Sequence, residues 1–167
     1  SNHYRLNEIY GEISEIELCL AALFHDMNHT GSGPDDKNIN IAIESFDKFM
    51  EEINSNDQEI RSLLVNSIDK IKSLIRLTQF PHTNDEISEV NGITIQQKIM
   101  RDSDMMSAVE DNWLQTTIFG LGEEFKTGSA LQQVNDQIKF ILSNTLYTEW
   151  AKDKWNFKVG SVLSELQ

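Results

Sequence analysis

The sequence predicts an all-α protein, a single-domain helical bundle of about six to eight helices that covers residues 1–167. Apolar residues recur at intervals of three and four through most of the chain, which is the spacing of helices that pack one face on a core. The 167 residues include only two prolines and eight glycines, so few positions would interrupt a helix. A chain of this length buries enough apolar surface for one domain of ordinary size.

The composition limits the classes of partner. Hydrophobic residues make up 39% of the chain, and the formal net charge is -13. This charge argues against binding of nucleic-acid backbone, which needs clustered Lys and Arg, but is compatible with a small phosphorylated substrate if a cation carries the electrostatics. No apolar run reaches the roughly 20 residues that span a bilayer, so no membrane contact is expected. The single Cys19 and the lack of a signal-peptide pattern favour a cytoplasmic location, and no pattern predicts an oligomeric state.

Two helices are predicted in the first part of the chain. One spans Tyr4–Glu12, where apolar residues recur at helical spacing. The next spans Ser14–Asp26, because Ser14 is a suitable N-cap and Glu17 three residues later completes a capping box. The segment Asn28–Lys37 is rich in turn formers and is predicted to be a loop.

Two apolar stripes predict the helices of the middle of the chain. The first stripe begins near Asn38 and continues to Ile53, and the polar residues 54–56 interrupt it. The second begins at about Asp57 and ends near Thr78, ahead of a proline. Residues 79–92 are polar and irregular, and we expect a loop there.

The remaining helices are predicted from the same periodicity. A helix begins around Thr94 and carries the run KIMRDSDMM. Another spans Asn112–Lys126, and one long helix runs from Ala130 to Trp150. A short helix at Gly160–Leu166 would close the chain.

The stretch LAALFHDMNHTG, residues 20–31, carries the strongest functional signal. An apolar run ends there in adjacent His25 and Asp26, although a core helix rarely ends in two groups that each need a partner once removed from water. Imidazole and carboxylate are ordinary ligands of divalent metals. We therefore expect the metal centre of a helical hydrolase at this helix end, where the backbone relaxes and adjacent side chains can meet one ion.

Further ligands are expected from other helices. On an antiparallel hairpin, the arms that lead from His3 and from His25 to the turn differ in length by only about 4–5 Å, so His3 would lie near the level of His25. A second carboxylate is expected from the run Arg101–Met106, which places two acids, Asp102 and Asp104, in an otherwise apolar helix.

The order His, His-Asp, Asp resembles the signature of the HD-domain metal-dependent phosphohydrolases. The doublet His25-Asp26 matches the centre of that signature, and His3 matches its first histidine by position. The family's common Asp-Ala-Asp-Leu stretch, in which the second Asp binds metal, is similar to residues 102–105, so Asp104 matches the final aspartate. The resemblance implies an ion held by four residues: His3, His25, Asp26 and Asp104.

The stretch His25–Gly31 also resembles the HD-x-x-H-x-G motif of the cyclic-nucleotide phosphodiesterase branch, and Trp113–Gly128 is similar to its W…EEF…G segment. Small bacterial HD proteins carry segments similar to Asp35–Asn40 and Thr78–His82. The branch's base-selecting glutamine and its upstream histidine, usually the proton donor, are not found in the sequence. Their absence argues against cyclic-nucleotide specificity.

The resemblance implies hydrolysis of a phosphomonoester or phosphodiester, with a nucleotide as the candidate substrate. One or two divalent ions (Mn, Fe, Mg or Zn) would activate a bound water, with Asp26 among the ligands. His29, or less simply His82, would protonate the leaving oxygen or help to bind a second ion. Candidates for contacts behind the metal ligands or to substrate are Asp102, Asn38, Asn40 and Glu44.

Two other functions fit parts of the pattern. A non-catalytic signalling or binding module would keep the HD fold and its metal, and the missing proton donor favours it, as does the short spacing of 22 residues between His3 and His25. A two-iron oxygenase ranks lower, because it needs further histidines after the doublet and only His29 and His82 remain.

Overall fold

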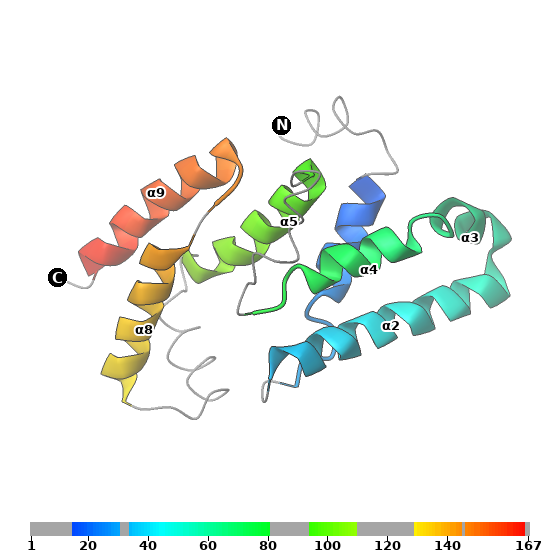
Figure 1. Cartoon of the computed structure of the whole chain (residues 1–167), viewed down its shortest axis with the longest axis horizontal. Coiled ribbons are helices and arrows are strands. Elements are labelled where there is room, and N and C mark those ends of the chain that lie inside the picture. Colours follow the sequence, from blue (N-terminus) through cyan, green and yellow to red (C-terminus); the bar gives the residue numbers. More distant parts are fainter. Residues whose placement is uncertain (1–14, 31–33, 81–93, 110–128, 145, 166–167) are drawn as a thin grey trace. The chain divides into compact units, whose positions relative to one another are not determined.

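The computed structural model describes residues 15–30, 34–80, 94–109, 129–144 and 146–165, and every regular element in these ranges is a helix (Figure 1). The predicted all-α fold class is therefore confirmed. Among the described helices, none is both long enough and apolar enough to cross a bilayer. The predicted helices Tyr4–Glu12 and Asn112–Lys126 lie outside these residues.

Contacts divide the chain into two compact units. The N-terminal unit comprises Ser1–Thr30 and Pro34–Met100, and the C-terminal unit comprises Gly31–Gly33 and Arg101–Gln167. This division does not test the prediction that residues 1–167 form one domain, which stays a prediction.

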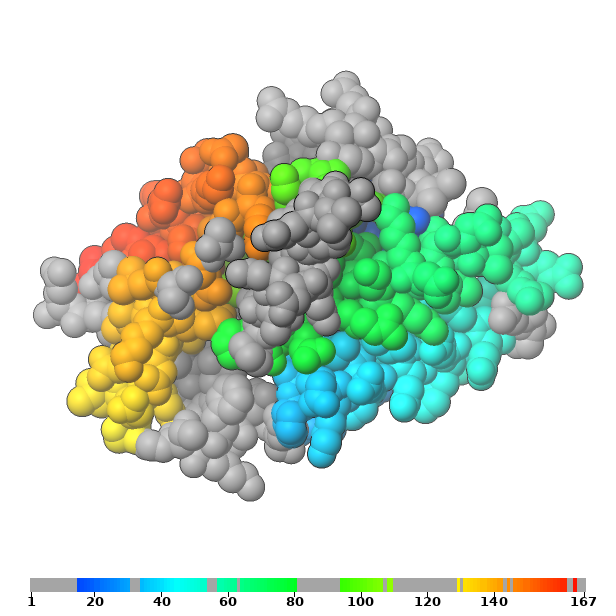
Figure 2. Space-filling model, viewed as in Figure 1, coloured from blue at the N-terminus to red at the C-terminus, as the bar shows by residue number. Residues whose placement is uncertain are grey.

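The N-terminal unit is built from a helix over residues 15–24, α2 (Asp35–Asn56), α3 (Gln58–Leu64), α4 (Ile68–Arg76) and the first part of α5 (Ile95–Met106). Helices α3 and α4 lie against α2 on the visible face in Figure 2. The predicted stripe of α2 is confirmed, since its apolar residues face the core. These are Ile39, Ala42, Ile43, Phe46 and Met50.

Helix α2 begins at Asp35 rather than near Asn38 as predicted. Pro34 takes the N-cap position with an extended backbone, and its fixed φ suits the residue that precedes a first turn. Asp35 and Asp36 then occupy that turn, where negative side chains oppose the positive end of the helix dipole. The predicted loop therefore ends before its acidic residues.

Phe24 joins the helix of residues 15–24 to α2. Its ring contacts Phe46 edge-on with centroids 5.4 Å apart, and it lies 5.2 Å from the ring of Phe49. Phe24 and Phe46 are both buried. Aromatic pairs of this kind add about 0.5–1.5 kcal/mol to the free energy of burial, so this contact fixes the end of the first helix on α2.

The single helix predicted from Asp57 to Thr78 is wrong at its centre. The structure has two helices there, and a turn at residues 65–67 separates α3 from α4. Asp57 caps α3, because its Oδ1 accepts hydrogen bonds from the backbone of Glu59 and Ile60. The hydroxyl of Ser67 at the break is buried and donates to Glu17 over 2.7 Å.

Glu17 is the centre of a buried polar network that links three helices. Besides the bond from Ser67, its Oε2 accepts a hydrogen bond from Gln96 on α5 at 2.9 Å and lies 2.6 Å from the ammonium of Lys70 on α4. Burial alone would raise the pKa of this carboxyl, but the hydrogen bonds from Lys70, Ser67 and Gln96 and the charge of Lys70 outweigh it and lower the pKa. Glu17 is therefore ionised and paired at neutral pH.

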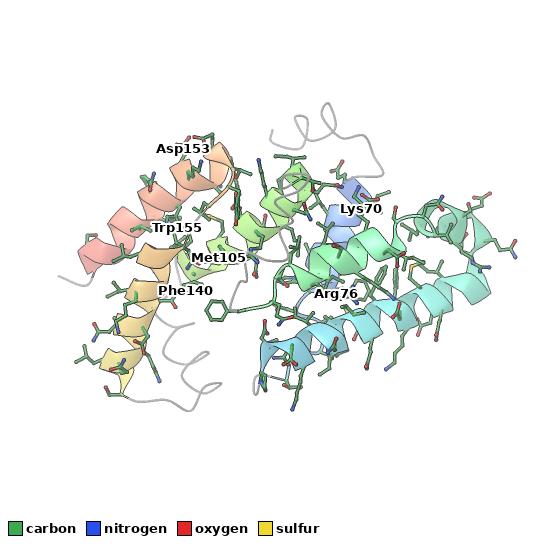
Figure 3. The ribbon with its side chains drawn as sticks, in the orientation of Figure 1. Lys70, Arg76, Met105, Phe140, Asp153 and Trp155 are labelled. Atoms are coloured by element: carbon green, nitrogen blue, oxygen red, sulfur yellow. The ribbon has the colours of Figure 1, made fainter. Side chains whose placement is uncertain are left out.

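The C-terminal unit contains the end of α5, the short helix η2 (Ser107–Val109), α8 (Ala130–Ser143) and α9 (Glu149–Glu165). Met105 and Trp155 are among the residues that form its core, and Phe140 packs against them (Figure 3). The other buried members are Met106, Val109, Ile141, Leu146 and Ala151.

The long helix predicted from Ala130 to Trp150 is also wrong. Helix α8 ends at Ser143, and α9 begins at Glu149 and includes the described part of the predicted closing helix. The backbone N–H groups of Tyr147 and Thr148 donate to Asp102 instead of continuing the helix. The carboxylate of Asp102, which is distant in the sequence, therefore accepts the N–H groups just before the first residue of α9.

We predict that Glu17→Gln lowers the free energy of unfolding by about 2–3 kcal/mol at neutral pH, because an amide nitrogen would face at least one of the buried donors. The pKa of Glu17 is lowered by folding, so its contribution is complete above the usual value of 4.5 and is lost as the pH falls through the folded-state pKa. Urea unfolding of wild type and variant at neutral and acidic pH measures both effects.

Glu51→Gln is the matched control, because Glu51 is an exposed acid of α2. Its effect should stay within about 0.5 kcal/mol. Equal losses of stability in the two variants at neutral pH would contradict the role given to Glu17.

Candidate metal centre

The first helix ends in a tight turn that presents His25 and Asp26. The backbone N–H of His25 bonds to Ala21 O at 2.9 Å, which is the last helical hydrogen bond, and the N–H of Met27 bonds to Phe24 O. Asn28 then has a φ of 61°, in the left-handed region that ends many helices. The chain therefore turns back toward α2 immediately after the His-Asp doublet.

A backbone carbonyl fixes the ring of His25. Its Nδ1 lies 2.7 Å from Ala22 O, and because a carbonyl only accepts, Nδ1 carries the hydrogen. The second ring nitrogen, Nε2, lies 3.2 Å from Oδ2 of Asp26. Only 20% of the His25 side chain is exposed, whereas 73% of the Asp26 side chain is. Nε2 of His25 and Oδ2 of Asp26 thus face each other at the surface.

The carboxyl of Asp26 has a lowered pKa. The hydrogen bond from His25 is the largest cause, burial opposes it, and the charges of His25 and His29 add to the lowering. Asp26 is therefore an anion at neutral pH, which is the form that binds a metal ion.

The separation of this pair also matches that of two neighbouring ligands of a metal ion, which would take the place of the proton that His25 donates to Asp26. Two ligands at about 2.0–2.2 Å from an ion, with angles of about 90–110°, lie about 3.0–3.5 Å apart. The observed separation between Nε2 and Oδ2 falls within this range. A hydrogen bond from the other ring nitrogen to a backbone carbonyl is also typical of histidines that bind metals.

The described residues do not test the other two predicted ligands. His3 lies outside them, and Asp104 belongs to the C-terminal unit. In the ranges that the structure describes, no three or more His, Cys, Asp or Glu residues form a group suited to a metal. His25 and Asp26 thus form a half-site whose completion stays a prediction.

Side-chain hydrogen bonds hold the loop after the doublet against α2. Asn28 Nδ2 donates to Ser45 Oγ at 2.9 Å. The backbone N–H and the hydroxyl of Thr30 both donate to Oδ1 of Asn38, at 3.2 and 3.0 Å. Asn38, predicted to support the ligands or the substrate, is buried and holds this loop. Asn40, its companion in that prediction, is exposed on α2.

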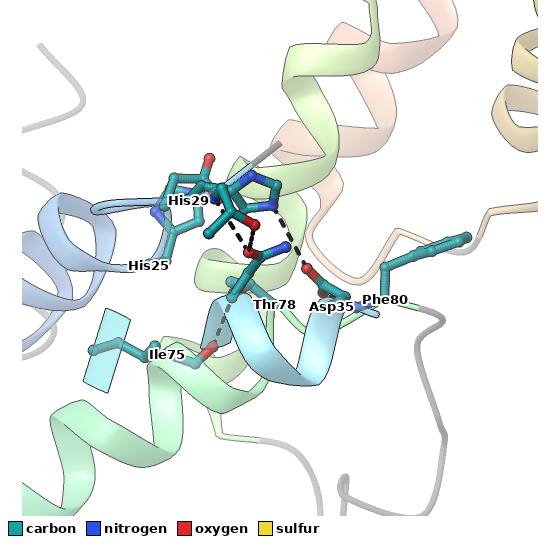
Figure 4. Close-up of polar contacts among 9 residues, drawn as sticks. His25, His29, Asp35, Ile75, Thr78 and Phe80 are labelled. Atoms are coloured by element: carbon teal, nitrogen blue, oxygen red, sulfur yellow. Dashed lines mark hydrogen bonds and ion pairs between the residues drawn. The ribbon is translucent and has the colours of Figure 1, made fainter. Parts of the chain in front are cut away.

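His29 faces the first turn of α2. Its Nε2 lies 3.8 Å from Oδ1 of Asp35, and the other oxygen of Asp35 accepts a hydrogen bond from the backbone N–H of Phe80 at 2.6 Å (Figure 4). The sequence pattern placed Asp35 in a loop before the helix, so the contact of Asp35 with His29 was missed. His82, the alternative to His29, lies outside the described residues.

The two acids of α5 have different surroundings. Asp102 is 1% exposed, and its carboxylate accepts hydrogen bonds from the backbone N–H groups of Tyr147 and Thr148 and from the Thr148 hydroxyl, at 2.6–2.9 Å. Asp104 is half-buried and lies about 200° further around the helix. The carboxylate of Asp102 thus binds the backbone at the start of α9, and Asp104 remains the candidate metal ligand.

Comparison of the chain with protein-family models, curated proteins and solved structures finds no match. The assignment of the candidate site therefore depends on the geometry of its residues.

We predict that Asn28→Gly is more stable than Asn28→Ala by about 1 kcal/mol, the reverse of the order expected inside a helix. Both variants lose the bond to Ser45, but only alanine adds a Cβ to a left-handed backbone. Thermal unfolding of the two variants measures the difference. An alanine variant as stable as the glycine variant would contradict the positive φ at this residue.

We also predict that Asp102→Asn lowers the free energy of unfolding by about 2–3 kcal/mol, because the amide would turn a donor toward donors that are now satisfied. Asp153→Asn, at an exposed position of α9 (Figure 3), is the control and should change stability by less than about 0.5 kcal/mol. Urea unfolding compares them. If Asp102→Asn is as mild as the control, Asp102 does not hold the start of α9.

Proposed function

We propose that the chain is a metal-dependent phosphohydrolase that acts on a phosphomonoester or phosphodiester, with a nucleotide as the candidate substrate. One observation carries the proposal. The His25 ring is held by Ala22 O so that Nε2 lies beside the carboxylate of Asp26, at a partly exposed helix end. A fixed imidazole next to an ionised carboxylate is half of a site for a divalent cation.

His25 Nε2 and Asp26 Oδ2 would hold the ion (Mn, Fe, Mg or Zn) together with His3 and Asp104. When bound, such an ion lowers the pKa of a water ligand and polarises a phosphoryl oxygen. The net charge of the chain supports a role for a bound cation, because a protein of net charge -13 repels a phosphate unless positive charge is supplied at the site.

His29 would transfer a proton to the leaving oxygen. Its backbone N–H is bonded to Asp26 O at 3.2 Å, so its position is tied to that of the doublet. The next residue, Thr30, is bonded twice to the buried Asn38, which keeps the loop on α2. About a quarter of the His29 side chain is exposed, so a substrate can reach the ring.

We expect the purified chain to bind Mn²⁺, and we expect His25→Ala and Asp26→Asn each to weaken that binding at least tenfold, because each removes one ligand. Isothermal titration with Mn²⁺ measures affinity and stoichiometry. The same proteins are assayed with p-nitrophenyl phosphate, bis(p-nitrophenyl) phosphate and nucleoside phosphates. Turnover by the wild type should fall at least a hundredfold in both variants.

Glu51→Gln, an exposed acid on α2, should leave both binding and turnover unchanged. Binding that depends on His25 and Asp26 without turnover of any substrate would favour the alternative, a non-catalytic metal-binding module. A wild-type chain that neither binds a divalent ion nor hydrolyses a phosphate ester would overturn the proposal.

A further inference from the structure

We propose that Asp35 is the positioning residue of His29, a role that rests on the proposed function of this site. Asp35 begins α2, and its carboxylate bridges two segments that are distant in the sequence. One oxygen accepts the backbone N–H of Phe80 at 2.6 Å, and the other faces Nε2 of His29 at 3.8 Å (Figure 4). One oxygen of the carboxylate is thus held by the backbone of Phe80, and the other faces the His29 ring.

The bond from Phe80 gives this carboxylate a fixed direction. An acid in the first turn of a helix ordinarily points into solvent and interacts with the helix dipole alone. Asp36, the next residue, is such an acid and is exposed. Asp35 has only 26% of its side chain exposed, and Phe80 lies 45 residues further along the chain. Its orientation is therefore set by tertiary structure.

The backbone on both sides of the His29 ring is also fixed. The N–H of His29 bonds to Asp26 O, and Thr30 is bonded to Asn38. The 3.8 Å separation is longer than a hydrogen bond but within the range of an ion pair with a protonated imidazole, and catalytic contacts are often long until substrate binds. Asp35 therefore selects the ring orientation that places His29 beside the doublet.

The experiment compares Asp35→Asn and Asp35→Ala with the matched control Asp36→Asn in the full chain, with Mn²⁺ and bis(p-nitrophenyl) phosphate. Asp35→Ala should lower kcat at least tenfold while KM stays within about twofold, and Asp35→Asn, which can still meet the ring through its amide oxygen, should recover part of the loss. Mn²⁺ affinity should stay close to wild type, and thermal unfolding should show every variant folded at the assay temperature, with a lower melting temperature where Asp35 no longer accepts the N–H of Phe80. Asp36→Asn should match the wild type throughout.

A second measurement does not depend on turnover. The chain has four histidines, so the imidazole nitrogen signals of His29 can be assigned with a His29→Gln variant. These signals should shift in Asp35→Ala and stay in place in Asp36→Asn. Shifted signals in a chain without turnover would retain the contact and overturn only the proposed function. Unshifted signals, a kcat equal to that of Asp36→Asn, or a loss of Mn²⁺ affinity in Asp35→Ala would overturn the positioning role.

Discussion

The packing of Phe24 on α2 is the constraint on which the candidate site depends. Burial of a Phe side chain contributes about 1.5–3 kcal/mol, so the contact of this ring with Phe46 and Phe49 anchors the C-terminal end of the helix of residues 15–24 on α2. The two residues that follow Phe24 are then carried to the edge of the core, where His25 and Asp26 keep access to solvent. The left-handed Asn28 returns the chain to α2 from there. The apolar contact of Phe24 thus determines where His25 and Asp26 lie.

The two helix breaks that sequence reasoning missed share one feature. Each break lies where a buried carboxylate from another helix binds groups at the break: Glu17 accepts the hydroxyl of Ser67, and Asp102 accepts the N–H groups of Tyr147 and Thr148. The acceptor and the break are 45–50 residues apart in the sequence. Apolar periodicity is a local property, and it correctly predicted the stripe of α2 and the start of α5. A hydrogen bond between distant segments leaves no trace in that periodicity.

The candidate site likewise combines local features, which the sequence predicts, with contacts between distant segments, which it does not. The doublet His25-Asp26 and the nearby His29 could be predicted, because their residue types and spacing are local. The contact of Asp35 with His29 could not, since it requires α2 to begin earlier than its apolar stripe and requires the backbone of Phe80 to hold the carboxylate. The structural role of Asp102 could not be predicted either, because its partners Tyr147 and Thr148 lie 45 and 46 residues further along the chain.

The carboxylates of this chain differ in how many hydrogen-bond donors they accept. A carboxylate that accepts many donors stabilises the fold, whereas one that accepts few can bind a ligand. A carboxylate has about four such sites. Glu17 and Asp102 each receive three donors and are almost fully buried, so neither has room for an ion or a water. Asp26 faces a single ring nitrogen and has 73% of its side chain exposed, and its lowered pKa keeps it ionised. Its remaining lone pairs face water, and a cation can replace that water without breaking any contact that holds the fold. Of these three acids, Asp26 therefore contributes least to the fold and is best placed to bind a cation.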